Sequence, residues 1–149
     1  MFATDLPFGD IQHAPGASAD QIAAGIEKYG IQVIVVSDTS DGEYRPYVYT
    51  VGFRDRGLPE LIAFADDEQQ LDEMGAIFYR LARRKLALTA GDCLQLHGES
   101  LFVATPYSEF DDFLQERCLI EARAYYGVDH LDLLVVVKEH ELHDPAGLH

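Results

Sequence analysis

Hydrophobic positions recur at helical spacing in three parts of the chain, each bounded by residues typical of helix ends. The predicted helices span residues 18–30, 66–86 and 108–126. Ser18 and Gln21 match a capping box, and Gly30 suits the left-handed position that closes the first helix. Ser108 is the predicted cap of the third helix and Gly127 its end. The apolar stripe of this third helix is irregular, which predicts a break inside it.

Short runs rich in β-branched and aromatic residues predict strands between these helices. The predicted strands span residues 31–36, 47–53, 60–65, 93–97, 101–105 and 131–137. The Asp-Gly pair at 41–42 suits a tight reversal between the first two strands. In the second strand, alternation places the odd-numbered residues from Tyr47 to Phe53 on one bulky face. A meander is the simplest connection of the first three strands.

These elements predict an α+β fold, because adjacent strand pairs outnumber strict alternations of strand and helix. We expect a mainly antiparallel sheet of about six strands with about three helices packed on it. No repeat or linker-like stretch divides the chain, so a single domain over 1–149 is predicted. Residues 1–17 are expected to form an N-terminal arm and residues 139–149 a polar, solvated tail.

The charge of the chain excludes some partners and favours others. Lys and Arg number 11 against 26 Asp and Glu, which gives a net charge of −15. Such a surface repels nucleic acid and anionic membranes and favours a basic protein partner. The two cysteines and the absence of a long apolar run or basic leader predict a cytoplasmic protein.

The best candidate site lies where the strand 47–53 turns into the strand 60–65. The residues predicted to bind a ligand there are Tyr49, Thr50, Gly52, Arg54, Pro59 and Glu60. Backbone amides beside Gly52 and the guanidinium of Arg54 could hold a carboxylate or phosphate, so the predicted ligand is a small anion. The alternative is structural: Tyr49 and Thr50 pack in the sheet, Gly52 forms a bulge, and the arginines make surface ion pairs.

Other reactive groups give weaker signals: no metal site is predicted, and the sequence indicates no particular cofactor. His140, His143 and Asp144 have a spacing that could chelate Zn, Ni or Fe, but Pro145 ends any helix there, which favours a solvated tail. Cys93 and His97 would lie about 13 Å apart on one strand, too far for a nucleophile pair. Cys93 and Cys118 are therefore expected to be buried thiols. The chain lacks the serine-hydrolase, P-loop and dinucleotide-binding motifs.

Tyr-Thr-Val-Gly at 49–52 is followed by Pro-Glu-Leu-Ile at 59–62, and Tyr-Tyr-Gly stands at 125–127. These three segments resemble the sequence of an uncharacterised bacterial family, the domain of unknown function numbered 4262. The likeness covers most of residues 18–138. Family members tend to end in a Trp-rich pattern, whereas this chain has no Trp. The resemblance implies a fold and a bacterial context, and it transfers no catalytic residue.

Two classes of function follow. The first is a small accessory domain that binds a small ligand or a protein partner. The alternative is an enzyme acting on a small anionic substrate at the segment from Tyr49 to Glu60, with Glu60 as proton acceptor. Homo-oligomerisation through an edge strand at 101–105 is a third expectation.

Overall fold

The computed structural model describes residues 11–13, 16–37, 44–96, 98–141 and 144–147. Its seven described strands form one mixed sheet in the order β1-β2-β3-β4-β7-β6-β5. They are β1 (Ile11–His13), β2 (Gln32–Val36), β3 (Tyr47–Val51), β4 (Glu60–Phe64), β5 (Cys93–Leu96), β6 (Glu99–Ala104) and β7 (Leu133–Lys138). The predicted α+β class is confirmed. The sheet is mixed, because β1–β2 and β4–β7 pair in parallel while the other neighbours pair antiparallel.

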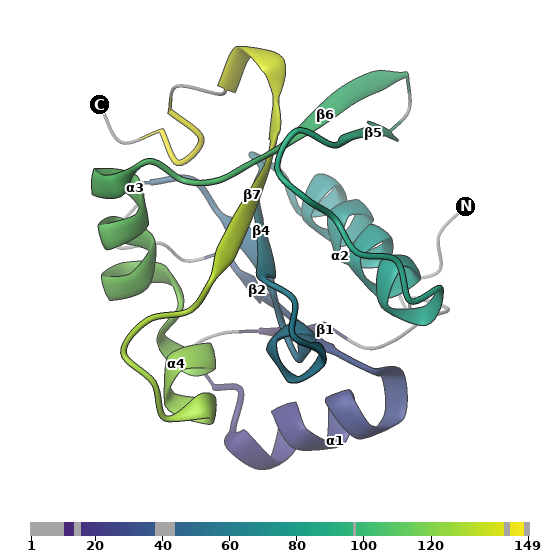
Figure 1. Cartoon of the computed structure of the whole chain (residues 1–149), viewed down its shortest axis with the longest axis vertical. Coiled ribbons are helices and arrows are strands. Elements are labelled where there is room, and N and C mark those ends of the chain that lie inside the picture. Colours follow the sequence, from purple (N-terminus) through teal and green to yellow (C-terminus); the bar gives the residue numbers. More distant parts are fainter. Residues whose placement is uncertain (1–10, 14–15, 38–43, 97, 142–143, 148–149) are drawn as a thin grey trace.

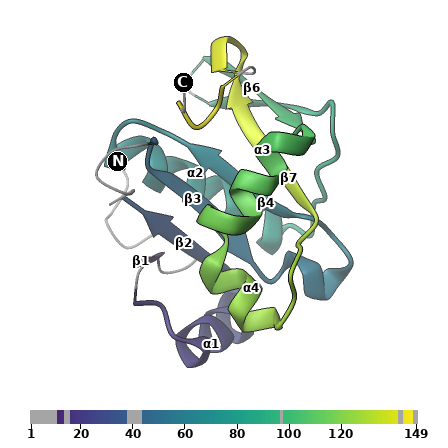
Figure 2. The ribbon, with the colours of Figure 1, turned by 90° about the vertical axis from the view of Figure 1, so that its left-hand side faces the viewer.

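Helices cover both faces of this sheet (Figure 1). They are α1 (Ala19–Tyr29), α2 (Glu68–Arg83), α3 (Ser108–Phe113) and α4 (Ile120–Tyr126), with a π-helical turn, η3 (Leu114–Cys118), between α3 and α4. Short 3-10 turns occur at η2 (Phe53–Arg56) and η4 (Glu139–Glu141). The helix α2 packs on one face, whereas α3, η3 and α4 pack on the other, the side that faces the viewer in Figure 2.

The helix ends follow the sequence in most places. The Ser18 hydroxyl accepts from the Gln21 amide at 3.2 Å, the Gln21 side chain accepts from the Ser18 amide at 2.9 Å, and Gly30 has φ +92°. The predicted break in the third helix is confirmed by η3. Its predicted cap is wrong, because the capping position is Tyr107, which makes no side-chain capping bond, and Ser108 is already helical.

Alternation along β2, β3, β4 and β7 divides their side chains between two hydrophobic cores. One core lies under α2 and contains Val33, Val48 and Val136, and the other lies under α3–η3–α4 and contains Tyr47, Tyr49 and Val135. Phe53 was predicted to share the face of Tyr49 but lies in the α2 core. The strand ends at Val51, and Gly52 (φ +129°) reverses the alternation before Phe53.

The ends and edges of the sheet have three features that the local patterns did not predict. Residues 11–13 of the predicted arm form the edge strand β1, which runs parallel to β2. The segment 101–105 is not an edge, because β6 pairs with both β5 and β7. The predicted solvated tail is partly packed: Ala146 is fully buried and its carbonyl accepts from the Arg45 amide at 2.9 Å. The turn at 41–42 lies outside the described residues.

No helix in the described parts of the chain is both long and apolar enough to cross a membrane.

Candidate functional site

The turn between β3 and β4 wraps its backbone amides around the carboxylate of Glu60. The amides of Gly52, Phe53 and Arg54 donate to this carboxylate at 3.1, 3.2 and 3.1 Å. The Thr50 hydroxyl donates to it at 2.7 Å. Three successive amides that converge on one anion form a nest of the kind that binds phosphate or carboxylate. In this protein the anion is a side chain of the same chain.

Glu60 also connects the turn to α4. The Tyr126 hydroxyl donates to Glu60 Oε2 at 2.7 Å and accepts from the Gly52 amide at 2.6 Å. The Thr50 hydroxyl accepts from the Leu61 amide at 2.9 Å, in place of a ladder bond between β3 and β4. Both carboxylate oxygens therefore have several donors, and the loop 52–59 is held at one end of the sheet.

Burial and hydrogen bonding act in opposite directions on the charge of Glu60. The side chain is fully buried, and burial raises its pKa because a charged carboxylate loses its hydration. The hydroxyls of Tyr126 and Thr50 and the amides of Arg54 and Gly52 lower the pKa, by a smaller amount. The net direction is upward. Desolvation and the charge of Glu60 also raise the pKa of Tyr126, which keeps its hydroxyl a donor.

The structure brings only part of the predicted site together. Thr50, Gly52 and Glu60 meet directly, and Arg54 joins them through its backbone amide. The Arg54 guanidinium lies over the Tyr126 ring, with its carbon 5.2 Å from the ring centre. Tyr126 completes this network and was missed by the sequence reasoning, because it lies 66 residues from Glu60 and no local pattern connects the two.

Tyr49 and Pro59 lie apart from this network. Tyr49 is fully buried in the other core, where its hydroxyl donates to Glu121 at 3.0 Å. Pro59 belongs to a shallow apolar dent on the surface of the α2 core. The dent is lined by Phe53, Leu58, Pro59, Leu61, Leu86, Ala87 and Leu88.

A larger hollow lies between β1, the end of β2 and the first turns of α2. Its volume is about 490 Å³, within the range of about 300–1,000 Å³ that ligand sites occupy. Its lining consists of Ile11, Gln12, His13, Val35, Glu68, Leu71 and Asp72. We call it the α2 hollow. Sequence reasoning missed it because its wall includes β1, a strand of three residues inside the predicted arm.

The acidic groups of the α2 hollow sit one helical turn apart. Glu68 and Asp72 are at positions i and i+4 of α2, where like charges repel each other. Partial burial and then the charge of Glu68 raise the pKa of Asp72, and the nearby His13 acts in the opposite direction. Val35 and Leu71 are buried at the base of the hollow, and the partly exposed Ile11 supplies apolar surface. The arrangement favours a ligand with a positive charge and some apolar surface.

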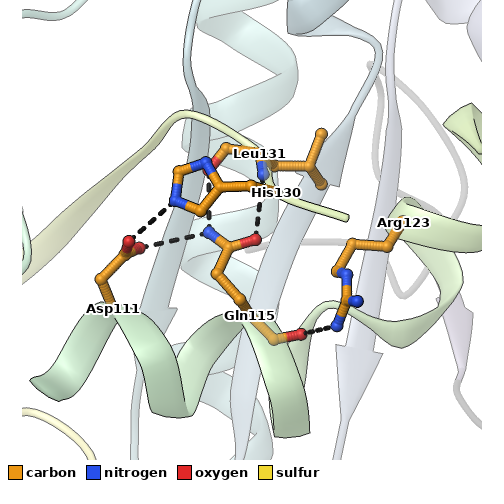
Figure 3. A network of polar contacts seen from close by, with 5 residues as sticks. All are labelled: Asp111, Gln115, Arg123, His130 and Leu131. Atoms are coloured by element: carbon orange, nitrogen blue, oxygen red, sulfur yellow. Dashed lines mark hydrogen bonds and ion pairs between the residues drawn. The ribbon is translucent and has the colours of Figure 1, made fainter. Parts of the chain in front are cut away.

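A third polar cluster joins α3 and η3 to the segment that leads into β7 (Figure 3). The side chain of Gln115 accepts from the Leu131 amide at 2.9 Å and donates to the Leu131 carbonyl at 2.8 Å. It also donates to Asp111 at 3.2 Å, and Asp111 in turn pairs with His130 at 2.8 Å. Arg123 donates to the Gln115 carbonyl. These hydrogen bonds hold the segment before β7 against α3 and η3. Short π-helical turns often occur at functional sites.

The cysteines and histidines do not form a reactive centre among the described residues. Cys118 is buried, as predicted, and burial raises its pKa to about 12, so its thiol stays protonated. The expectation for Cys93 was wrong, because it is exposed on the edge strand β5. His97 and His143 lie outside the described residues, as does the side chain of His140. No group of three or more potential metal ligands occurs within the part of the chain that the structure describes.

The protein is an α+β domain built on a seven-stranded mixed sheet. It has a polar site, whose amides bind the Glu60 carboxylate of the same chain, and a hollow on its surface, the α2 hollow. The model of the family described as "Domain of unknown function (DUF4262)" matches residues 25–144, most of the chain, and the protein belongs to this family. Searches of the curated proteins and of the solved structures found no match.

Proposed function

We propose that this domain binds a small cationic ligand, an amine or guanidinium compound with an apolar part, in the α2 hollow. The observation that carries the proposal is the pair of carboxylates of Glu68 and Asp72, which line a hollow of about 490 Å³. A cation placed between them relieves the repulsion between the two like charges. The net charge of −15 raises the local concentration of cationic ligands further.

The walls of the hollow suit such a ligand in other respects. The partly exposed Ile11 offers apolar contact, and the amide of Gln12 and the imidazole of His13 add hydrogen-bonding groups. Gly75 allows α2 to approach β1 and β2 closely, since a Cβ there would lie 3.2 Å from Val33 Cγ1 and 3.6 Å from Ile11 Cδ1. This contact supports the hollow from the next turn of the helix.

The test measures binding of three probes, arginine, spermidine and choline, by calorimetry and by the thermal unfolding midpoint. We expect at least one probe to bind, and the double variant Glu68→Gln/Asp72→Asn to bind it at least tenfold more weakly. The matched control is Asp112→Asn/Glu116→Gln, which removes two charges from exposed positions on the opposite helical layer. Equal weakening in both double variants, or binding of no probe, contradicts the proposal.

The anion site predicted around Tyr49 to Glu60 stays a prediction, and so does an enzyme that uses Glu60 as a proton acceptor. The amides of Gly52, Phe53 and Arg54 bind Glu60 itself, so an external anion has to compete with this carboxylate for them. Arg54 and Arg56 are the exposed cationic residues of that segment. If an anion binds there, Arg54→Ala removes the rise in the unfolding midpoint caused by phosphate.

A further inference from the structure

Most of the basic residues in this acidic chain gather at one end of the molecule. Seven of the eleven Lys and Arg residues occur in three short stretches, 28–30, 54–57 and 80–85. They are Lys28, Arg54, Arg56, Arg80, Arg83, Arg84 and Lys85. Asp55 is the only acidic residue in the same stretches. We call the surface that these residues form the basic end.

Side-chain contacts show that the three stretches adjoin one another. Arg56 donates to the Ala82 carbonyl at the end of α2, at 3.0 Å. The same guanidinium lies against the end of α1, since a Cβ added to Gly30 would lie 2.4 Å from Arg56 Nη2. The rings of Tyr29 and Tyr79 meet with centres 5.8 Å apart. The basic end is therefore a product of the fold, assembled from α1, η2 and α2.

Favourable interaction with the α2 dipole explains only part of this charge. Cations near a helix C-terminus are stabilising, and Arg80 and Arg83 lie in the last turn of α2. Arg54 and Lys28 are exposed but belong to η2 and α1, so the dipole of α2 does not account for them. Lys85 has φ +57°, the only non-glycine residue with a positive φ among those described. Glycine or asparagine adopts this conformation more easily, so a lysine at this position has a conformational cost.

An apolar surface lies directly beside these cations. Leu86 follows Lys85 and is half exposed, at 50%. It belongs to the apolar dent, together with Phe53 and Leu58 from the loop that carries Arg54 and Arg56. The phosphate groups of a nucleic acid make no apolar contact with such a dent. A peptide that carries both acidic and apolar side chains can contact the basic residues and the dent together.

We propose that the basic end, with the apolar dent, is a docking surface for an acidic protein segment that carries exposed leucine-like side chains. Carboxylates of the segment pair with Arg84, Lys85 and Arg54, and an apolar side chain packs over the exposed Leu86 and the shallow dent beside it. The surface is separate from the α2 hollow, so this inference does not depend on the proposed function. The acidic remainder of the molecule steers an acidic partner away from other faces.

The probe is a fluorescent eight-residue peptide with two central leucines and three acidic residues on each side, measured by fluorescence anisotropy in 50 mM salt. Two control peptides are used. In the first, amide residues (Asn or Gln) replace the acidic residues, and in the second, serines replace the two leucines. We expect the first peptide to bind most tightly, and Arg84→Glu/Lys85→Glu to weaken its binding at least tenfold. Lys138→Glu, a charge reversal on β7 away from the basic end, is expected to have little effect.

The remaining outcomes overturn the proposal. They are no binding of the acidic peptide, equal binding of the amide or serine control, or the same loss in Lys138→Glu as in the double variant. A single-stranded 20-nucleotide DNA serves as a further arm, and tighter binding of this DNA than of the peptide assigns the surface to nucleic acid instead. Urea unfolding of each variant verifies that a loss of binding is not a loss of fold.

Discussion

Glu60 shows how one residue can satisfy a chemical expectation in an unexpected way. The backbone at 52–54 has the amides expected for anion binding, and they hold a carboxylate of the same chain. A fully buried carboxylate is costly unless it is hydrogen bonded, and five donors offset part of that cost here. Glu60 is therefore central to the stability of the β3–β4 turn, whatever else binds to this domain.

The raised pKa of Glu60 predicts a particular dependence of stability on pH. A carboxyl whose folded pKa lies above its unfolded value, about 4.3, contributes stability below that value and loses it as pH rises through the folded pKa. We expect Glu60→Gln to be less stable by about 2 kcal/mol or more, because the Gln amide faces N–H donors. The difference in the free energy of unfolding between wild type and Glu60→Gln should shrink as pH rises above about 4.3.

Urea unfolding of both proteins from pH 4 to 8 measures this difference, and the contributions of the other carboxylates largely cancel between them. A difference that grows with pH contradicts the prediction, because it means that the five donors lower the pKa more than burial raises it.

At the scale of elements, two glycines in the β3–β4 connection have different tasks. Gly52 (φ +129°) ends β3 in close contact with neighbouring backbone: an added Cβ would lie 3.0 Å from Ile31 Cα and 3.1 Å from the Gly30 carbonyl oxygen. Gly57 (φ +74°) ends η2 in open space. Both positions favour glycine for their backbone conformation, but only Gly52 also keeps the turn close to the start of β2.

The substitutions Gly52→Ala and Gly57→Ala separate conformation from close approach. Gly57→Ala should cost about 1–2 kcal/mol, the ordinary penalty of the left-handed region. Gly52→Ala should cost at least about 1 kcal/mol more, because backbone atoms have to move and the amides around Glu60 move with them. The free energy of unfolding in urea measures both. Equal costs for the two variants mean that the contact with Ile31 is unimportant.

At the scale of the whole molecule, charge is distributed unevenly. The chain carries a net charge of −15, yet seven of its eleven basic residues lie at the basic end. Acidic residues therefore far outnumber basic ones in the rest of the chain, and Glu68 and Asp72 in the α2 hollow are among them. This polarity underlies both proposed binding surfaces, which attract ligands of opposite charge.

Self-repulsion predicts that salt stabilises this protein. Raising the salt concentration from 0.01 to 0.15 M shortens the Debye length from about 30 to about 8 Å and screens the acidic surface. We expect a gain of about 1 kcal/mol, seen as a rise of about 2–4 °C in the thermal midpoint. Asp112→Asn/Glu116→Gln should show a smaller rise. A midpoint that falls with salt indicates that attractive ion pairs outweigh the repulsion.

Local patterns were sufficient for most elements of the fold. The capping box at Ser18, the left-handed glycines Gly30 and Gly127, and the apolar stripe of α2 act within a few residues, so the sequence alone predicts them. Alternation also predicts β3, a short apolar run predicts β4, and adjacent strands make an antiparallel meander the simplest arrangement. The α+β class follows from these elements, and the resemblance at 49–52 and 59–62 correctly indicates the family.

Tertiary structure decided the strand order, the parallel pairs and the composition of the sites. β4 pairs with β7 across about 70 residues, and Tyr126 reaches Glu60 across 66, separations over which no periodicity in the sequence carries information. The strand β1 is too short to stand out from the predicted arm and exists through its pairing with β2. Whether the amides at 52–54 face solvent or the Glu60 carboxylate depends on the path of the whole turn. The sequence thus determines which groups are present and their local conformation, whereas packing determines which of them meet.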